Sequence, residues 1–339
     1  MSDQTMRAMA VPAAGEPFEL VERPVPDPAP DEVRIAVEAC GICHSDAYVR
    51  EGTYPGIEYP RVPGHEIAGR IDAVGADVEH WAEGDRVGVG WHGGHCFTCE
   101  ACRRGDFQGC ENGAITGLTF DGGYAEYATV PAEAVGAVPD ELDAVDAAPL
   151  LCAGITTFNA LRHTDAGPGD LVVVQGVGGL GHLGIQYAHA AGFETVALSR
   201  SPDKEGLALE LGADHFVDTS ETDAAEALQS LGGARVVLAT APAADAISDV
   251  VGGLGRNGEV VVVGVPGQPF EVDAGVLVRT RGAVRGWSSG HAKDWEDTLA
   301  FSALREVTPE VETYPLEEAA AAYERMMQNE ARFRVVLEP

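Results

Sequence analysis

The hydrophobic pattern changes character about halfway along the chain. Up to about residue 150, short apolar runs alternate with polar positions, as in Glu32–Val37 and Ile67–Val74, and glycine and proline separate them. A period of two is typical of strands that bury one face. We therefore expect a compact, mostly antiparallel β domain with long loops in this part.

From about residue 170 the pattern follows a rhythm of strand, turn and helix. We expect strands over residues 171–175, 195–199, 215–218, 235–239, 260–263 and 283–287. Helical segments, 183–191 and 204–211, separate the first of these. Such alternation implies parallel strands joined by crossover helices. Near the end of the chain we expect a helix over residues 316–329 and a strand over 334–337.

Length and charge narrow the class of protein. The 339 residues suggest about two domains of roughly 150 residues each. With 22 basic and 54 acidic side chains, the net charge of −32 disfavours nucleic acid and anionic membranes as partners. Lys204 and Lys293 are the only lysines. This acidic, lysine-poor composition resembles that of halophilic proteins, in which molar salt screens charges over about 3 Å; the alternative is an acidic mesophilic protein.

Location and redox state follow from two further observations. We expect no stretch to approach the roughly 20 apolar residues that cross a bilayer. Residues Met1–Thr5 lack the basic start and apolar run of a signal peptide, which predicts a cytoplasmic protein. The seven cysteines, an odd number without an export signal, indicate metal binding or catalysis rather than a disulfide framework.

Four of the cysteines are closely spaced, in the pattern CxxCxxCx7C: Cys96, Cys99, Cys102 and Cys110. Thiolates bind zinc tetrahedrally, and two-residue gaps let the backbone fold around one ion. Four ligands leave no open position, so this site is expected to be structural. The alternatives are free thiols, which would oxidise when clustered this densely, and an iron–sulfur cluster, which nothing else in the sequence requires.

Two further cysteines and one histidine could form a second zinc site. Cys43 lies in Gly-Ile-Cys-His-Ser-Asp, His65 in Pro-Gly-His-Glu, and Cys152 in Leu-Cys-Ala-Gly. Two thiolates and an imidazole are a ligand set of catalytic zinc, with a fourth position open to water or substrate. The three residues are far apart in sequence, however. Taken singly, each is better explained as a buried apolar cysteine or a core histidine.

A glycine-rich segment follows the expected strand 171–175 and precedes a helix. Between a strand and a helix, the pattern GxGxxG lets the backbone approach a pyrophosphate at the helix N-terminus. Its residues are Gly176, Val177, Gly178, Gly179, Leu180 and Gly181.

The end of the next expected strand bears on the choice of nucleotide. Where an acidic residue would bind a ribose 2′-hydroxyl, the chain has Ser199 and Arg200. A missing carboxylate followed by arginine favours NADP over NAD, and Lys204 could assist. The alternative is that Arg200 is simply solvated.

With both cysteine-containing sets and the glycine loop in view, the chain resembles a zinc-containing medium-chain alcohol dehydrogenase from about Arg7 to Leu337. The resemblance implies an α/β protein with two domains. A GroES-like β-rich catalytic domain would comprise residues 1–152 and 291–339, with a structural zinc lobe at about 91–113. A Rossmann doubly wound parallel sheet would comprise residues 153–290.

The resemblance also implies roles for individual residues. Cys43, His65 and Cys152 would bind the catalytic zinc, and the residues around them would support the reaction. Ser45 would accept the alcohol proton, Asp46 would orient His65, and Glu66 would approach the metal during exchange. Residues matching nucleotide contacts are His44, Thr156 and Leu180. Cys40 matches no ligand.

The implied activity is hydride transfer between a primary or secondary alcohol and NAD(P), with NADP favoured. A homotetramer or homodimer is implied, with subunit contact near Ala283–Gly290. Tyr48 departs from the family pattern, which often has histidine there; a tyrosine, with a reference pKa near 10, is a poor base. Tyr54 and Trp91 could line a pocket for small or aromatic alcohols, but each is equally compatible with a core aromatic. The alternatives are a polyol or formaldehyde-type dehydrogenase, or a nucleotide binder without catalysis.

Overall fold

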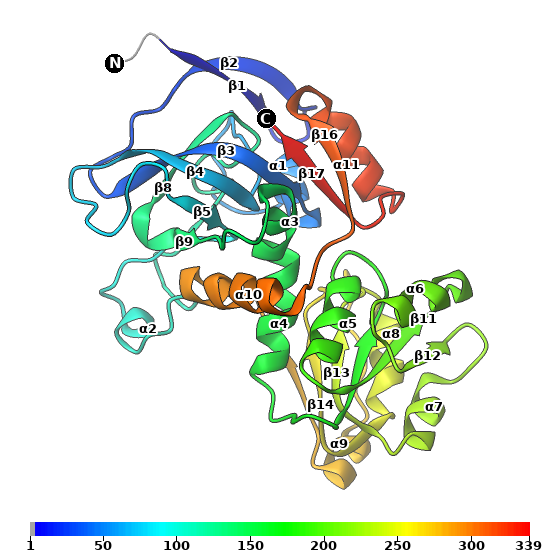
Figure 1. The fold of residues 1–339 in the computed structure, drawn as a ribbon. Coiled ribbons are helices and arrows are strands. Elements are labelled where there is room, and N and C mark those ends of the chain that lie inside the picture. Colours follow the sequence, from blue (N-terminus) through cyan, green and yellow to red (C-terminus); the bar gives the residue numbers. More distant parts are fainter. Residues whose placement is uncertain (1–3) are drawn as a thin grey trace. The chain divides into compact units, whose positions relative to one another are not determined.

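The computed structural model describes residues 4–339, so Met1–Asp3, part of the segment used to predict the location, lie outside the described residues. The chain forms two compact units (Figure 1). One comprises the chain up to Cys152 together with Gly290–Pro339, and the other comprises Ala153–Ser289.

The main sheet of the first unit has seven strands. Their order is β16-β17-β3-β4-β5-β9, with β8 paired to β3 outside this path. All pairs are antiparallel except β16 with β17, as the alternating pattern predicts for most of them. The strands are β3 (Glu32–Ile42), β4 (Ile67–Val74), β5 (Arg86–Val89), β8 (Tyr127–Pro131), β9 (Gly136–Ala137), β16 (Val311–Pro315) and β17 (Arg334–Glu338).

Smaller elements complete the first unit. Two two-stranded sheets pair β1 (Thr5–Ala10) with β2 (Glu19–Pro24), and β6 (His92–Gly94) with β7 (Ala114–Ile115). The helices are η1 (His44–Asp46), α1 (Ala47–Glu51), α2 (Glu100–Arg103), η2 (Ala132–Ala134), α3 (Ala144–Pro149), α10 (Ala292–Arg305), η5 (Leu316–Glu318) and α11 (Ala319–Met327).

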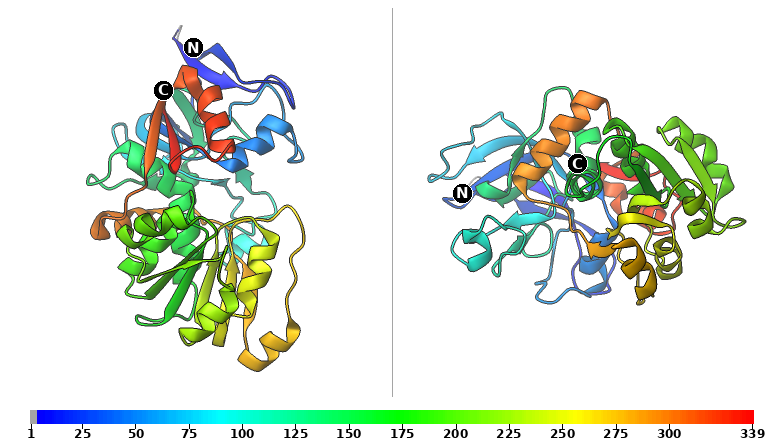
Figure 2. Two further views of the ribbon diagram at one scale, coloured as in Figure 1. Left: turned by 90° about the vertical axis from the view of Figure 1, so that its right-hand side faces the viewer. Right: turned by 90° about the horizontal axis from the view of Figure 1, so that it is seen from below.

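The second unit is a parallel six-stranded sheet in the order β12-β11-β10-β13-β14-β15. This is the Rossmann order, and helices lie on both faces of the sheet (Figure 2). The strands are β10 (Leu171–Gln175), β11 (Glu194–Ser199), β12 (His215–Asp218), β13 (Ala234–Ala239), β14 (Leu254–Val262) and β15 (Ala283–Gly286). The helices are α4 (Ile155–Arg162), α5 (Gly181–Ala190), η4 (Pro202–Lys204), α6 (Glu205–Glu210), α7 (Ala224–Ser230), α8 (Ala244–Val251) and α9 (Ala274–Thr280).

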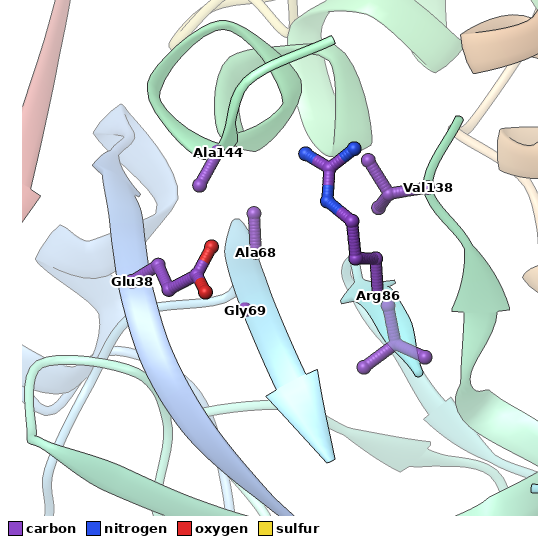
Figure 3. A pocket seen from close by; sticks show the side chains of 7 residues that line it. Glu38, Ala68, Gly69, Arg86, Val138 and Ala144 are labelled. Atoms are coloured by element: carbon purple, nitrogen blue, oxygen red, sulfur yellow. The ribbon is translucent and has the colours of Figure 1, made fainter. Parts of the chain in front are cut away.

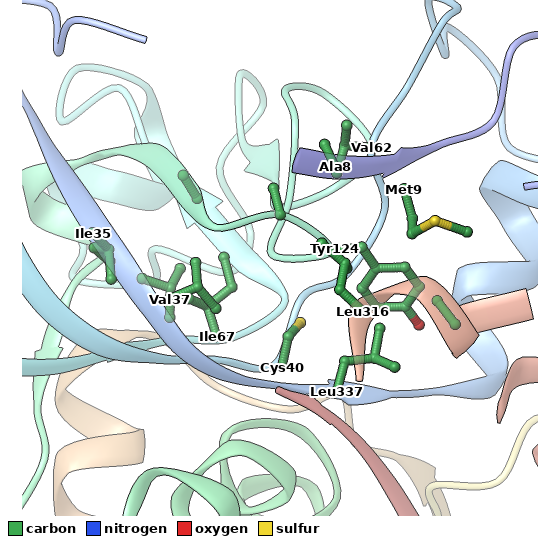
Figure 4. Close-up of a cluster of buried hydrophobic side chains, with 14 of the residues drawn as sticks. Ala8, Met9, Ile35, Val37, Cys40, Val62, Ile67, Tyr124, Leu316 and Leu337 are labelled. Carbon is green, nitrogen blue, oxygen red and sulfur yellow. The ribbon is translucent and has the colours of Figure 1, made fainter. Parts of the chain in front are cut away.

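Each unit has a core of its own. The core of the first unit lies between β3, β4 and the last strand, where Ile35, Ile67 and Leu337 are fully buried (Figure 4). The core of the second unit is formed by the apolar strands and by α7 and α8, as Val173, Val237 and Ile247 illustrate. The expected strands thus supply much of both cores, and helices complete them.

One prediction about apolar segments is wrong as stated. Within the described residues, the helical stretch Ala144–Arg162 is 19 residues long and passes a length-and-hydropathy test for a membrane span. However, 67% of the most apolar part of this stretch is buried inside the protein. The core helix of a globular protein has the same composition, because it is apolar on most sides.

Candidate active site

The first candidate ligand, Cys43, directly follows the end of strand β3. The chain turns there into the short helix η1, and the backbone N–H of Cys43 donates to Asp46 Oδ2 at 2.8 Å. This bond closes a tight turn that holds the thiol at the strand end. The thiol is buried.

Strand pairing brings His65 and Glu66 to the same place. Both residues immediately precede strand β4, whose Ile67 pairs with Cys40 of β3. The Gly41 N–H donates to the Glu66 carbonyl at 3.0 Å, which extends this pairing toward Cys43. Antiparallel register therefore accounts for a proximity that sequence spacing alone could not predict.

Cys152 reaches the site from a helix. Pro149 ends helix α3, and Leu150–Gly154 continue as one π-helical turn, η3. Proline removes a backbone donor, and π turns of this kind redirect side chains within a helix. Cys152 lies in the middle of the turn, with its Sγ 3.8 Å from Cys43 Sγ.

These residues form one cluster. One ligand atom each from Cys43, His65, Glu66 and Cys152 lies within 4.8 Å of all the others. His65 is fully buried, and no group among the described residues hydrogen-bonds to its Nε2. A buried polar atom without a partner is costly, and two thiols beside such a nitrogen are a suitable donor set for zinc. The cluster therefore fits a metal ion.

The charges around the cluster favour a thiolate at Cys43. Hydrogen bonding with Cys152 lowers the pKa of the Cys43 thiol well below its usual value, against the effect of burial. The charges of His65 and Arg334 act in the same direction as that bond. Thiolate is the form of cysteine that binds metal.

Glu66 is held by a buried cation. Its Oε1 accepts a hydrogen bond from the guanidinium of Arg334, on strand β17, and the same guanidinium donates to the Ile42 carbonyl at 3.3 Å. Burial raises the pKa of the Glu66 carboxyl to about 7, and Arg334 opposes this shift. The sequence pattern did not single out Arg334; the available signal was an arginine directly before the apolar run Val335–Leu337.

A second residue that sequence reasoning missed is Tyr124. Asp46 Oδ1 lies 3.2 Å from His65 Nδ1, and the hydroxyl of Tyr124 donates to Asp46 Oδ2 at 2.9 Å. All three side chains are fully buried. Nothing in the sequence distinguishes this tyrosine from an ordinary core aromatic.

The four closely spaced cysteines also come together. One Sγ atom each from Cys96, Cys99, Cys102 and Cys110 lies within 4.8 Å of the others. Backbone N–H groups of Cys99 and Cys96 donate to Cys96 Sγ and Cys110 Sγ, each at 3.4 Å. Hydrogen bonds, first that from Thr98, lower the pKa of Cys96 to about 5. A thiolate is therefore favoured at Cys96, whereas burial raises the pKa of Cys102 to about 12. The close approach of the four sulfur atoms fits one zinc ion with four ligands.

Aromatic side chains lie beside the His65 cluster. The ring of Trp91 meets that of His65 edge-on, with centroids 4.9 Å apart. Tyr48 packs against Trp91 at 6.2 Å and against Tyr54 at 5.7 Å. We call Tyr48, Tyr54 and Trp91 the aromatic wall. Ser45 is half-buried in η1, two residues after Cys43.

The glycine loop of the second unit connects β10 to α5, as predicted. Gly176 has a φ of +99°, a conformation that favours glycine. A Cβ at Gly178 would meet nothing within 4 Å, so a ligand could approach the backbone there. The loop also contains Gly179 and Leu180, and Gly181 is the first residue of α5. Thr156 lies on α4 of the same unit. His44, in contrast, belongs to the first unit.

The residues expected to select the nucleotide lie after β11. Ser199 is almost fully buried, and its Oγ accepts a hydrogen bond from the Ser201 N–H at 3.1 Å. Arg200 is exposed. The ammonium of Lys204 donates to the carbonyl of Val177 in the glycine loop at 2.7 Å. Lys204 thus lies beside the loop, whereas Arg200 reaches solvent.

The hollows found elsewhere do not suit a substrate. One, lined by Glu38, Arg86 and Val138, is too narrow to admit a water molecule (Figure 3). Another, of about 310 Å³, lies at the amino ends of β10 and β13. The glycine loop follows the carboxyl end of β10, where open α/β sheets bind ligands.

Comparison with known proteins agrees with the two-unit fold. Residues 29–140 match the family described as alcohol dehydrogenase GroES-like domain, and residues 179–303 match zinc-binding dehydrogenase. Alcohol dehydrogenase patD of Penicillium expansum is 46% identical over 310 residues, 91% of each chain.

Solved structures give the same result. Cinnamyl alcohol dehydrogenase SbCAD4 from Sorghum bicolor is 32% identical, with a TM-score of 0.89 over 99% of this chain and 98% of that one. CAD from Helicobacter pylori complexed with NADP(H) is 28% identical, with a TM-score of 0.87 over 98% of each chain. The chain is therefore an oxidoreductase that acts on alcohols, and it belongs to the zinc-binding alcohol dehydrogenase family.

Proposed function

We propose that this chain interconverts primary or aromatic alcohols and the corresponding aldehydes, with NADP as the preferred nucleotide and two zinc ions per chain. The observation that carries the proposal is the buried set of Cys43, His65 and Cys152, in which His65 Nε2 has no hydrogen-bond partner among the described residues. Cys96, Cys99, Cys102 and Cys110 would hold the second, structural ion.

The residues around the first cluster have distinct roles. When bound, the zinc ion would polarise the substrate oxygen as a Lewis acid, and the nicotinamide would exchange hydride with the substrate carbon. Ser45 takes the proton of the alcohol hydroxyl. Asp46, 3.2 Å from His65 Nδ1, keeps the proton on that nitrogen and leaves Nε2 free for the metal. Arg334 holds Glu66 at the edge of the cluster.

We propose that Tyr48 passes the proton from Ser45 on to water. Tyr48 lies three residues further along the chain, and its side chain is partly exposed, with 37% of its surface accessible. Its hydroxyl could relay a proton to water without acting as a base. Tyr48 would thus take over the proton transfer for which the family often has a histidine at this position.

The aromatic wall favours apolar substrates over polyols. Trp91 meets the ring of His65 edge-on, and Tyr48 and Tyr54 extend the surface, so apolar groups beside the metal would contact rings rather than hydroxyl-binding partners. We expect kcat/KM for benzyl or cinnamyl alcohol to exceed that for sorbitol by about 100-fold or more, roughly 2.7 kcal/mol. Absorbance of the reduced nicotinamide measures both rates.

The same assay separates the alternatives. A preference for sorbitol would contradict the aromatic-alcohol proposal and indicate a polyol dehydrogenase. Turnover of formaldehyde only when a thiol is added would indicate the formaldehyde-type enzyme. Absence of turnover with every alcohol, despite bound nucleotide, would indicate a binding protein.

Preference for NADP rests on the residues after β11. The exposed guanidinium of Arg200 follows Ser199, so this strand end offers a phosphate a cation and no carboxylate. Replacing Arg200 with alanine should raise KM for NADP about 10-fold or more and change KM for NAD little, since one charged hydrogen bond contributes about 1.5–3 kcal/mol. Steady-state kinetics with both nucleotides measure this.

Arg256 provides a matched control for that substitution. It is also an exposed arginine of the second unit, but it lies in the hollow at the amino ends of the strands. Arg256→Ala should leave both KM values unchanged. Equal effects of Arg200→Ala on NAD and NADP would contradict a role in recognising the extra phosphate.

The proposal also includes the assembly of subunits. We propose a homodimer or homotetramer in which the β15 edge of the parallel sheet contributes a contact, near Ala283–Gly290. Strand β15 ends the order of the sheet, so its outer edge has no neighbouring strand among the described residues. Val265 and Val278, which lie in the segments before it, are 79% and 80% exposed.

Location in the cytoplasm is supported by the state of the cysteines. All seven cysteines are free thiols in the structure. Six of them belong to the two candidate metal clusters, and the remaining members of these clusters are His65 and Glu66. Thiolate ligands must stay reduced to bind zinc, and the cytoplasm maintains that state.

A further inference from the structure

Tyr124 is a buried residue of the first unit whose polar group points toward the metal-binding region. It lies in the loop before strand β8, and its side chain is fully buried among Met9, Cys40 and Leu316 (Figure 4). A buried tyrosine needs a partner for its hydroxyl. The partner here is a carboxylate, Asp46, rather than a backbone carbonyl.

The backbone around Tyr124 is tied to the segment that carries His65. Gly122 N–H donates to the Val62 carbonyl at 2.7 Å, and Gly123 N–H donates to the Gly64 carbonyl at 2.9 Å. Tyr124 N–H donates to the Pro63 carbonyl at 3.0 Å. Three consecutive bonds thus fix this loop to the residues that immediately precede His65.

The hydroxyl of Tyr124 is tied to the segment that carries Cys43. Asp46 Oδ2 accepts two hydrogen bonds, from the Tyr124 hydroxyl at 2.9 Å and from the Cys43 N–H at 2.8 Å. The other oxygen, Oδ1, faces His65 Nδ1 at 3.2 Å. The two bonds to Oδ2 therefore set the rotation of the carboxylate that faces the histidine.

Neighbouring groups pack closely around the tyrosine ring. A Cβ on Gly64 would overlap the ring, and a Cβ on Gly123 would approach Cys40 Sγ, which packs against the same region, at 2.8 Å. Phe18 covers the ring from another side, with centroids 6.2 Å apart. This packing restricts the ring whose hydroxyl donates to Asp46.

We propose that Tyr124 is a positioning residue, whose hydroxyl fixes the Asp46 carboxylate and, through it, the orientation of His65 toward the metal. The proposal deepens the proposed function and rests on it. Tyr124 does not touch substrate or metal; it links the two chain segments that supply Cys43 and His65. Its removal should therefore loosen metal binding at this cluster and leave the four-cysteine lobe unaffected.

The test measures the release of zinc from the purified enzyme. Excess chromogenic chelator is added, and the amplitude and rate of each release phase are recorded. The phase that accelerates in Asp46→Asn belongs to the cluster of Cys43 and His65. In Tyr124→Phe that same phase should accelerate about 10-fold, at the low end of the 10- to 100-fold effects of groups that support metal ligands directly. The phase of the four-cysteine lobe should not change.

A matched control and a double variant separate positioning from general destabilisation. Tyr59→Phe also deletes a hydroxyl of the first unit that donates a hydrogen bond, at 2.6 Å to the Val49 carbonyl, and should leave both phases unchanged. If Tyr124 acts through Asp46, then Asp46→Asn with Tyr124→Phe should release zinc no faster than Asp46→Asn alone.

The outcomes distinguish this proposal from the proposed function. A wild-type enzyme that binds no zinc at this cluster would overturn both. A wild type that holds zinc, with Tyr124→Phe releasing it at the wild-type rate, would overturn only the role of Tyr124. Equal acceleration of both phases in Tyr124→Phe, or additive effects in the double variant, would also overturn it.

Discussion

Replacing Cys43 or His65 by alanine should lower kcat/KM for alcohol oxidation by at least about 10³-fold and leave nucleotide binding nearly unchanged. A Lewis acid at the substrate oxygen contributes several kcal/mol to the reaction, and each 1.36 kcal/mol corresponds to a tenfold change in rate. Each substitution removes one of the ligands gathered within 4.8 Å. The glycine loop belongs to the other unit, so its contribution to nucleotide affinity should persist.

Two measurements check this expectation. Metal analysis should find two zinc ions per chain in the wild type and one in each variant, because the four-cysteine lobe is untouched. Fluorescence titration with reduced nucleotide should give dissociation constants within about threefold of the wild-type value, a difference of roughly 0.65 kcal/mol.

Cys40 supplies the matched control. It is also a buried cysteine, three residues before Cys43, but it is not part of the cluster. Cys40→Ala removes a thiol from the core and should retain both zinc ions and most of the activity. Full activity in Cys43→Ala or His65→Ala, or an equal loss in Cys40→Ala, would contradict the assignment of the cluster as the catalytic centre.

Much of the fold could be predicted because strand and helix patterns are local. The expected strand over residues 67–74 coincides with β4, and those over 171–175 and 215–218 coincide with β10 and β12. The glycine loop was recognisable because strand, glycines and helix are adjacent in sequence. The four-cysteine lobe was recognisable for the same reason.

The proximity of Cys43, His65 and Cys152 required the register of a sheet and a turn within a helix. Nothing local to Cys43 shows that Cys40 pairs with Ile67. Similarly, nothing local to Cys152 shows that the helix changes to a π turn after Pro149. Only the resemblance to a family could connect the three residues in advance.

Tyr124 and Arg334 were missed for a related reason. Each acts on the cluster through a polar group that arrives from a distant segment, and each side chain is buried. Hydrophobic patterning treats such positions as core. The function of each polar group depends on a buried carboxylate next to it, Asp46 for the Tyr124 hydroxyl and Glu66 for the Arg334 guanidinium.

The ion pair between Glu66 and Arg334 leads to the second large expected effect. Replacing Arg334 by leucine should lower the free energy of unfolding by about 3–5 kcal/mol, because it leaves a buried carboxylate without its cation. Arg334 has only 5% of its side chain exposed, and that of Glu66 is fully buried. Urea denaturation of the zinc-loaded enzyme measures the difference.

A surface ion pair of the same unit gives the comparison. Arg325 and Glu312 lie 2.6 Å apart, but their side chains are 38% and 25% exposed. Solvent screens such pairs, so Arg325→Leu should lower the free energy of unfolding far less than Arg334→Leu does. A loss in Arg334→Leu no greater than that in Arg325→Leu would contradict the importance of burial.

A compensating substitution tests the cause of the loss. If the uncompensated charge of Glu66 is responsible, then Arg334→Leu combined with Glu66→Gln should recover more than half of the stability, since the buried group is then neutral. If the lost packing of the long arginine side chain is responsible, the double variant should be as unstable as Arg334→Leu alone. Loss of zinc would be a further cause of lower stability, because Glu66 lies within the ligand cluster and its movement could weaken metal binding at Cys43. The zinc content of each variant therefore has to be measured as well.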